Sequence, residues 1–447
     1  MNAKFNIIAN VLGKVWASVM NFAFVPIYIR YLGIEAYGLI GFFVSILAAF
    51  FVLDMGLSTA INRELARLSV RNDAAPLAQN LMRTLEIVYW AAGCFIGLFI
   101  VIMAPWLATH WLKASLPVAE TTQAIRLMGL VALFRWPSPL YSGALMGLKR
   151  QVSLNVVNGL MATVQGGGAA LVLIAISPTI EAFFIWQSLA AGLQITFLAG
   201  LVWRHLAGSG HRPSFQGDAL RSVFGFSAGI TGITLLSVIL TQSDKFLLSR
   251  IIPLQNFGYY SLASSIAGTL NIGAMAIYSA MFPAFSQLVA LDDPTALKRL
   301  YHKSAQLLSV LVFPTGLCLS FFSFDLLRAY VSDPAIATNT RTLLSLLAIG
   351  NMILSIMLMP LALQLAYGWT KLSLYKNLVA VSIFIPLLWF MAHRYGPAGA
   401  AWVWIILTLG YFVFEAPIMH TRLLKGEQWH WYGKDVAVVA VLSALVL

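Results

Sequence analysis

The feature that most constrains this chain is a series of twelve apolar stretches, each about twenty residues long. A helix of that length crosses a bilayer core of roughly 30 Å. Of the 447 residues, 60% are hydrophobic and 10% are charged, whereas soluble domains carry about 25% charged residues. We therefore predict an all-α membrane protein with twelve transmembrane helices. The predicted helices are 5–29, 37–61, 80–104, 122–146, 153–176, 182–203, 223–248, 257–283, 305–324, 342–366, 374–393 and 399–420.

Basic residues divide unevenly between the two sides of these helices. The richer side has Lys4, Arg63, Arg67, Arg71, Lys149, Arg150, Arg204, Arg212, Arg221, Lys298, Arg299, Lys303, Lys371, Lys376, Arg422, Lys425 and Lys434. The poorer side has Arg30, Lys113, Arg250, Arg328, Arg341 and Arg394. Because cytoplasmic loops are enriched in Lys and Arg, we predict that both termini are cytoplasmic. This topology explains the net charge of +12, and the scattered basic residues favour no nucleic-acid partner.

A weak internal repeat relates the two halves of the chain. A shift of about 220 residues places Arg30 on Arg250 and Gly38 on Gly258. The alternative is that these matches arise by chance. An even number of predicted spans in each half, with matched loops, favours a true repeat, because parallel repeats of this kind build alternating-access transporters.

The repeat predicts two pseudo-symmetric six-helix lobes around a central cavity. We place the N-terminal lobe at residues 1–210 and the C-terminal lobe at 211–425. The remaining segment, 426–447, is predicted to be interfacial or part of a further helix, because its apolar run is too short to cross the bilayer.

Polar residues inside the spans are the candidates for substrate contact. A charged residue in a membrane helix costs roughly 2.5 to 3.5 kcal/mol, so it usually faces protein or water. Arg135 stands out because it precedes Trp136-Pro137-Ser138-Pro139, where two prolines should kink the helix. The predicted cavity-lining residues are Lys14, Arg135, Asn10, Asn21, Arg126, Thr231, Thr234, Thr241 and Lys245. The residues predicted to act in coupling or gating are Asp54, Arg83, Glu86 and Asp244.

Purely structural interpretations remain open for several of these residues. Arg83 and Glu86 are three residues apart, and their whole role could be to neutralise each other. Asp244 could belong, with its neighbour Lys245, to a snorkelling pair at the outer end of a helix. The whole role of Asp54 could be to cap the end of its helix.

The sequence favours neither an enzyme nor a metalloprotein. None of its seven histidines forms a metal-ligand spacing, and it contains no phosphate-binding loop. Its two cysteines lie in apolar spans, which does not support a disulfide framework. We expect no catalytic residue, no metal site and no cofactor.

Several short motifs carry a family resemblance over essentially the whole chain. They are residues 21–38 (NFAFVPIYIRYLGIEAYG), 53–64 (LDMGLSTAINRE), 244–249 (DKFLLS), 257–263 (FGYYSLA) and 396–401 (GPAGAA). Together they resemble Wzx-type flippases, which belong to the polysaccharide transport branch of the multidrug/oligosaccharidyl-lipid/polysaccharide exporter superfamily.

The resemblance implies a function in the bacterial inner membrane. It implies translocation of undecaprenyl-diphosphate-linked oligosaccharide by alternating access, for O-antigen or other surface polysaccharide, with the lipid tail remaining among membrane lipids. Polysaccharide polymerase and chain-length machinery are the partner proteins that such a role would imply. A diphosphate needs fixed cations in an apolar setting, which fits Lys14 and Arg135. Amide and hydroxyl groups, such as those of Asn10 and Thr234, would bond sugar hydroxyls.

Three other functions remain open at the sequence level. A drug/cation antiporter of the same superfamily would need an acidic cavity, for which Asp54 and Glu86 are the only candidates. A peptidoglycan lipid-precursor flippase typically has two more helices. A membrane glycan polymerase or ligase would need a large outer loop, and the outer loops here are short.

Overall fold

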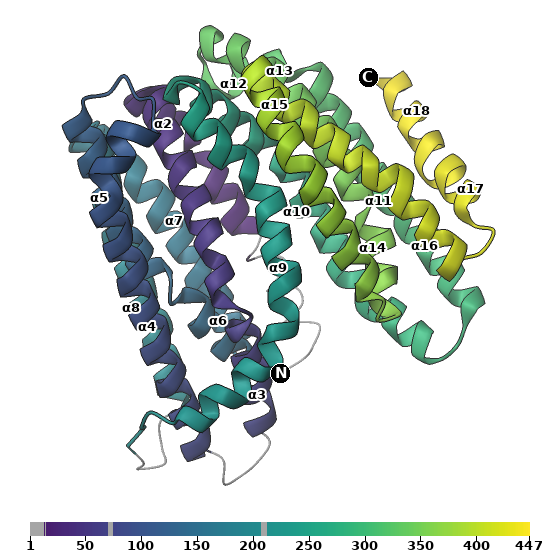
Figure 1. Ribbon diagram of the computed structural model, residues 1–447, viewed down its shortest axis with the longest axis horizontal. Helices are drawn as coiled ribbons and strands as arrows, with labels where there is room; N and C mark the ends of the chain where they lie inside the picture. Colours follow the sequence, from purple (N-terminus) through teal and green to yellow (C-terminus); the bar gives the residue numbers. More distant parts are fainter. Residues whose placement is uncertain (1–12, 14, 70–74, 207–211) are drawn as a thin grey trace. The chain divides into compact units, whose positions relative to one another are not determined.

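The computed structural model describes residues 13, 15–69, 75–206 and 212–447, without the side chains of 219, 222–231, 233 and 234 (Figure 1). The chain divides into two compact units, Met1–Val238 and Ile239–Leu447. This division falls inside one helix, α9 (Gly217–Ile251). The predicted lobe boundary, 210/211, lies outside the described residues, so the predicted lobes stay a prediction.

The first unit is built from long helices joined by short connections (Figure 1). It contains α2 (Val25–Phe50), α3 (Leu57–Leu68), α4 (Ala75–Trp106), α5 (Val118–Arg135), α6 (Ser138–Gly147), α7 (Gln151–Ala175), α8 (Ile180–Leu206) and the first part of α9. A 3₁₀ turn at Phe51–Asp54 links α2 to α3, and a π-helical turn at Leu107–Trp111 follows α4.

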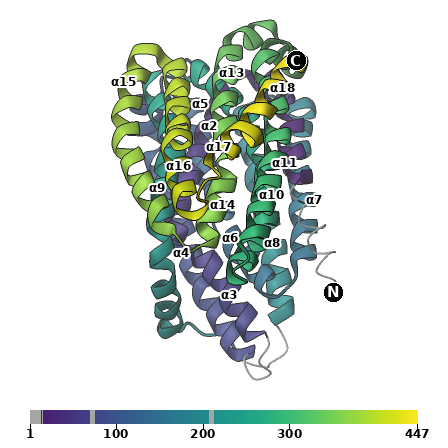
Figure 2. The ribbon, with the colours of Figure 1, turned by 90° about the vertical axis from the view of Figure 1, so that its right-hand side faces the viewer.

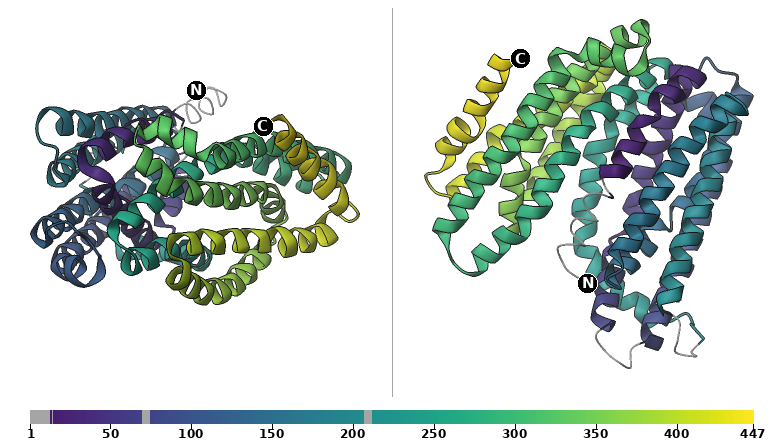
Figure 3. Two further views of the ribbon diagram at one scale, coloured as in Figure 1. Left: turned by 90° about the horizontal axis from the view of Figure 1, so that it is seen from above. Right: turned by 180° about the vertical axis from the view of Figure 1, so that it is seen from behind.

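The second unit continues from the last part of α9. It contains α10 (Leu254–Ala290), α11 (Pro294–Phe321), α12 (Ser323–Val331), α13 (Pro334–Ile356), α14 (Leu358–Ala366), α15 (Thr370–Gly410), α16 (Ala416–Leu423), α17 (Gln428–His430) and α18 (Val438–Val446). π-Helical turns at Tyr411–Glu415 and Trp431–Ala437 link α15 to α16 and α17 to α18. Helices α10, α11 and α13 run side by side (Figure 3).

The helices agree with the predicted spans. Among the described residues, eight continuous helical segments are long and apolar enough to cross a membrane, and two of them contain a break that separates two predicted spans. Each predicted span after the first coincides largely with helix in the structure. In the first span, 5–29, residues 5–12 and 14 lie outside the described residues, and the described part is helical apart from a turn at Phe24. The helices also extend beyond the apolar stretches. The region expected as a loop before residue 305 is instead the end of α10 and the start of α11.

Proline, glycine and capping residues explain where the helices begin and break. Asp293 caps α11 by accepting a hydrogen bond from the Ala296 backbone N–H at 2.9 Å, ahead of Pro294 at the first helical position. Gly33 and Gly396 have φ values of 82° and 61°, a left-handed conformation that glycine adopts without steric cost. Each therefore separates two predicted spans.

Close glycine contacts join α3 to α6 in the first unit. A Cβ atom added to Gly143 would lie 2.3 Å from the backbone oxygen of Ser58, and one added to Gly147 would lie 2.5 Å from that of Asn62. The spacing of four residues places both glycines on one face of α6, which lets the two helices approach closely. This contact positions α6 directly after the proline-containing break.

The C-terminal segment packs against α11 in the second unit. Helices α17 and α18 lie across α11 (Figure 2). Trp431 is fully buried and belongs to the same hydrophobic core as Phe285 and Tyr301. The segment that we expected to be interfacial or a partial helix is therefore helical from Gln428 to Val446, with a π-helical turn in its middle.

Candidate functional site

Arg135 lies at the C-terminal end of α5, where the chain breaks before α6. Its Nη2 donates to Oε1 of Gln187 at 2.8 Å and to Oε1 of Gln165 at 3.2 Å. Both partners are neutral amides. Within the described residues, no carboxylate forms an ion pair with this guanidinium, and its other N–H groups make no hydrogen bond there. The site therefore retains a positive charge and free donors.

A chain of amide side chains extends from Arg135 along α7 and α8. Gln165 Nε2 donates to Gln194 Oε1 at 2.7 Å, and Gln194 Nε2 donates to Asn158 Oδ1 at 3.1 Å. Gln187 Nε2 donates to the backbone oxygen of Gln165 at 3.3 Å. An amide side chain carries both hydrogen-bond donors and an acceptor. This array can therefore donate to a sugar hydroxyl or accept a hydrogen bond from one.

The local sequence explains why Arg135 lies where it does. Pro137 has no backbone N–H, so the helix is interrupted and α6 starts anew at Ser138. On α7, Gly166 follows Gln165 and allows the ring of Phe24 to approach, since an added Cβ would be 2.6 Å from that ring. Tyr28 on α2 donates to the Gly166 backbone oxygen at 2.8 Å, which fixes α7 against α2.

Glu86, in contrast, is surrounded by donors. The Arg83 guanidinium is 2.8 Å from Glu86 Oε2, and Oε1 accepts from the Tyr141 hydroxyl at 2.5 Å and from Trp203 Nε1 at 3.1 Å. Glu86, Tyr141 and Trp203 border a cavity of about 860 Å³ in the first unit, also lined by Trp90. The other lining residues include Leu127, Leu130, Phe134, Ile185, Ser188, Leu189 and Gly192.

Asp54 is buried at the end of its 3₁₀ turn. One of its carboxylate oxygens accepts a hydrogen bond from the Tyr89 hydroxyl on α4. The other accepts from Ser58 Oγ at 2.8 Å, across the junction between α2 and α3. Asp54 therefore links its own 3₁₀ turn to α3 through Ser58 and to α4 through Tyr89. The bond to Ser58 agrees with the capping interpretation, and the bond to Tyr89 is a contact between helices.

In the second unit, Asp244 and Lys245 contact each other. Lys245 Nζ is 3.4 Å from Asp244 Oδ2, which also accepts from the Tyr260 hydroxyl at 2.6 Å. Lys245 Nζ further donates to the backbone oxygen of Thr241 at 3.1 Å. The positive charge of Lys245 is thus partly neutralised, unlike that of Arg135. Its assignment as a cavity cation stays a prediction.

The remaining predicted site residues are not all brought together. Lys14 and Asn10 lie outside the described residues, as do the side chains of Thr231 and Thr234. Asn21 and Thr241 are exposed. Arg126 is exposed on α5, nine residues before Arg135 and therefore about half a turn away around the helix axis.

Several polar contacts were not foreseen from the sequence. The amides around Arg135 lie in two spans whose apolar periodicity gave no indication that they would pair. In the second unit, Lys376 was counted only among the basic residues of the cytoplasmic side, yet its Nζ is 2.8 Å from Glu415 Oε1. Gln364 also donates to that oxygen, at 3.0 Å. Polar residues inside an apolar span were the only available signal for such pairs.

The fold and these buried polar groups define an all-α, multi-pass membrane protein with a cationic, amide-lined site. The chain belongs to the polysaccharide biosynthesis protein family, whose model matches residues 27–333. This confirms the family resemblance carried by the sequence motifs. A Shigella flexneri protein named "Putative O-antigen transporter" is 22% identical over 377 residues, which is 84% of this chain and 88% of that protein.

Solved structures show the same fold at low sequence identity. An inward-facing multidrug resistance MATE family transporter of the MOP superfamily has a TM-score of 0.76 and 12% identity, covering 93% of this chain and 98% of its own. The lipid II flippase MurJ, in an inward closed conformation, has a TM-score of 0.69 and 13% identity, covering 99% of this chain and 98% of its own. The predicted fold class, a multi-pass helical membrane protein of transporter architecture, is confirmed.

Proposed function

We propose that this protein is a flippase that moves undecaprenyl-diphosphate-linked oligosaccharide across the bacterial inner membrane by alternating access. Its product would serve O-antigen or another surface polysaccharide, through polymerase and chain-length machinery. Membership in a polysaccharide biosynthesis family and the resemblance to a protein named as an O-antigen transporter support the substrate class. The transporter fold supports movement across the membrane.

The single observation that carries the proposal is the guanidinium of Arg135. It lies deep in a membrane helix bundle, and its hydrogen-bond partners among the described residues are two neutral amides. A diphosphate is poorly solvated by hydrocarbon, and a guanidinium can bind two of its oxygens in parallel. The anionic headgroup would therefore supply the charge that this site lacks.

The amide chain supplies a second part of the recognition. Gln165, Gln194 and Asn158 already bond one another, so their side chains are oriented before a glycan arrives. Such groups would exchange their mutual bonds for sugar hydroxyls with little change in the number of hydrogen bonds. This fits a transporter that must hold its substrate and then release it.

We keep the other predicted cavity residues as parts of this proposal with unequal weight. Lys14 would be the second cation for the diphosphate, and Asn10, Asn21, Thr231, Thr234 and Thr241 would offer further polar contacts. Lys245 carries less weight because Asp244 is next to its ammonium group. Arg126 carries less weight because it and Arg135 project from opposite sides of α5.

A cation antiporter is not favoured by the carboxylates that the structure describes. Asp54 accepts hydrogen bonds from Tyr89 and Ser58, and Glu86 is paired with Arg83. Both oxygens of Asp54 are thus already hydrogen-bonded, and the charge of Glu86 is neutralised by Arg83. The available charge within the described site is positive.

The function is tested by measuring translocation between leaflets with purified protein in vesicles. Two substrates are compared, a disaccharide linked to a polyprenol through a diphosphate and the same disaccharide linked without phosphate. We expect the protein to accelerate only the diphosphate-linked lipid. No protein-dependent translocation of that lipid, combined with uptake of a lipophilic cation, would refute the proposal in favour of the antiporter.

A further inference from the structure

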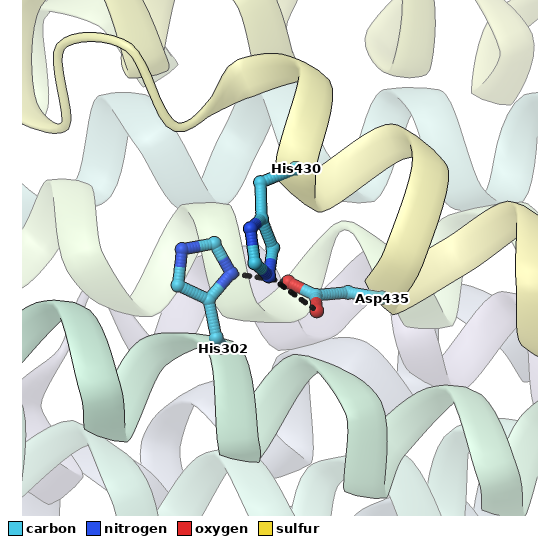
Figure 4. Close-up of side chains that lie close together, drawn as sticks. All are labelled: His302, His430 and Asp435. Atoms are coloured by element: carbon cyan, nitrogen blue, oxygen red, sulfur yellow. Dashed lines mark hydrogen bonds and ion pairs between the residues drawn. The ribbon is translucent and has the colours of Figure 1, made fainter.

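A cluster of two histidines and an aspartate lies in the second unit, away from Arg135. His302 comes from α11, His430 from α17 and Asp435 from the π-helical turn before α18 (Figure 4). The donor atoms of the three side chains all lie within 4.8 Å of one another. Asp435 is fully buried, the His302 side chain is 13% exposed and that of His430 is 39% exposed.

Both imidazole rings of this cluster are directed at the Asp435 carboxylate. His302 Nδ1 forms a hydrogen bond with Asp435 Oδ2. His430 Nε2 points at Asp435 Oδ1 but is 3.9 Å away, beyond hydrogen-bond distance. The two imidazole rings are 4.4 Å apart between centroids. The hydrogen bond to Asp435 explains the orientation of the His302 ring. It does not explain why the His430 ring is directed at the same buried carboxylate.

We propose that His302, His430 and Asp435 form a binding site for a divalent transition-metal ion of the zinc type. Two imidazole nitrogens and one carboxylate oxygen are typical zinc ligands, whereas calcium and magnesium prefer sites made of oxygen atoms. Tetrahedral zinc places its ligand atoms about 3.3 Å apart, so the three side chains need only small rotations to close around the ion.

The surroundings of His302 support this assignment. Its other ring nitrogen, Nε2, is 3.3 Å from Glu427 Oε2, an ion-pair distance without hydrogen-bond geometry, so a small rotation of either side chain would form the bond. A histidine that ligates a metal through one nitrogen usually donates the other N–H to a carboxylate, which fixes the orientation of the ring. Glu427 Oε1 accepts from Lys298 at 3.1 Å, which holds this carboxylate beside the His302 ring.

The remaining contacts shape the site further. Gln306 Nε2 donates to Asp435 Oδ1 at 2.8 Å, which orients the carboxylate from the side of α11. The partial exposure of His430 offers a path for the ion and a fourth position for water. The bound ion would tie the C-terminal helical segment to α11. The ligands come from segments about 130 residues apart, so no sequence spacing indicates the site.

The test is metal binding by the full chain in detergent, purified with a tag that contains no histidine and then stripped with a chelator. Calorimetric titration with Zn²⁺ should give one ion per chain, and Co²⁺ should give the visible absorption of a tetrahedral N/O site. We expect His430→Asn to weaken binding at least about 100-fold and Glu427→Gln about 10- to 100-fold. The control His393→Asn, an exposed histidine of α15, should bind as the wild type does.

A second readout guards against variants that fold poorly. Zn²⁺ should raise the thermal unfolding midpoint of the wild type and of His393→Asn, because an ion that binds only the folded state stabilises it. It should not raise that of His430→Asn. The proposal is overturned if the wild type takes up no stoichiometric Zn²⁺, or if His430→Asn binds it equally well. Neither result bears on flipping, which is measured separately.

Discussion

At the scale of single residues, Arg135 differs from an acid such as Glu86 in its partners: Arg135 bonds neutral amides, whereas Glu86 is paired with a cation. Arg135 could be selected from the sequence because it is deep in a span beside two prolines. Its amide partners, Gln165 and Gln187, could not be, since a pairing between separate helices leaves no trace in apolar periodicity. The pairing of Glu86 with Arg83 follows from helical spacing, but its bonds to Tyr141 and Trp203 do not.

Glu86 gives a prediction about coupling. If its protonation drives transport, Glu86→Gln should abolish the dependence of flipping on a pH gradient, because the amide cannot take up a proton. The measurement is the flipping rate in vesicles with and without an imposed gradient. Glu64→Gln is the matched control, because Glu64 is also paired with an arginine three residues away, Arg67. A gradient dependence that survives in Glu86→Gln would reject this residue as the coupling site.

At the scale of helices, breaks and close contacts position the site. The apolar stretches predicted where helices cross the bilayer, and Gly396 and Pro137 lie at breaks that the sequence marks with glycine or proline. The ends of helices were less predictable. Polar residues can extend a helix beyond the apolar core, as in α11, where Asp293 sets the start well before the apolar stretch begins.

The contact between α3 and α6 gives a prediction about stability. Gly143→Ala should destabilise the protein by about 1–3 kcal/mol, because the added Cβ would clash with the Ser58 backbone oxygen. Gly200→Ala on α8 is the control, since nothing lies within 4 Å of its added Cβ. It should stabilise the helix by roughly 0.5–1 kcal/mol. Thermal or denaturant unfolding in detergent measures both changes, and equal midpoints for the two variants would contradict the close packing.

At the scale of the whole molecule, the sequence predicted the membrane class and the transporter family. Helix length, the distribution of basic residues and short motifs are properties of the chain that need no knowledge of its folding. The cluster of His302 and Asp435 could not be predicted in this way, because only tertiary packing brings these residues together. Lys14, the other cation predicted to bind diphosphate, lies outside the described residues, so the structure leaves that assignment as a prediction.

The most direct test of the central claim is the flipping rate of diphosphate-linked oligosaccharide by Arg135 variants. Losing a charge-assisted hydrogen bond costs about 1.5–3 kcal/mol, so Arg135→Gln should slow flipping about 10- to 100-fold. Arg135→Lys should retain part of the rate, because it keeps the charge without the planar fork. Arg394→Gln, at an exposed arginine of α15, should flip at the wild-type rate. Wild-type flipping by Arg135→Gln would contradict the account.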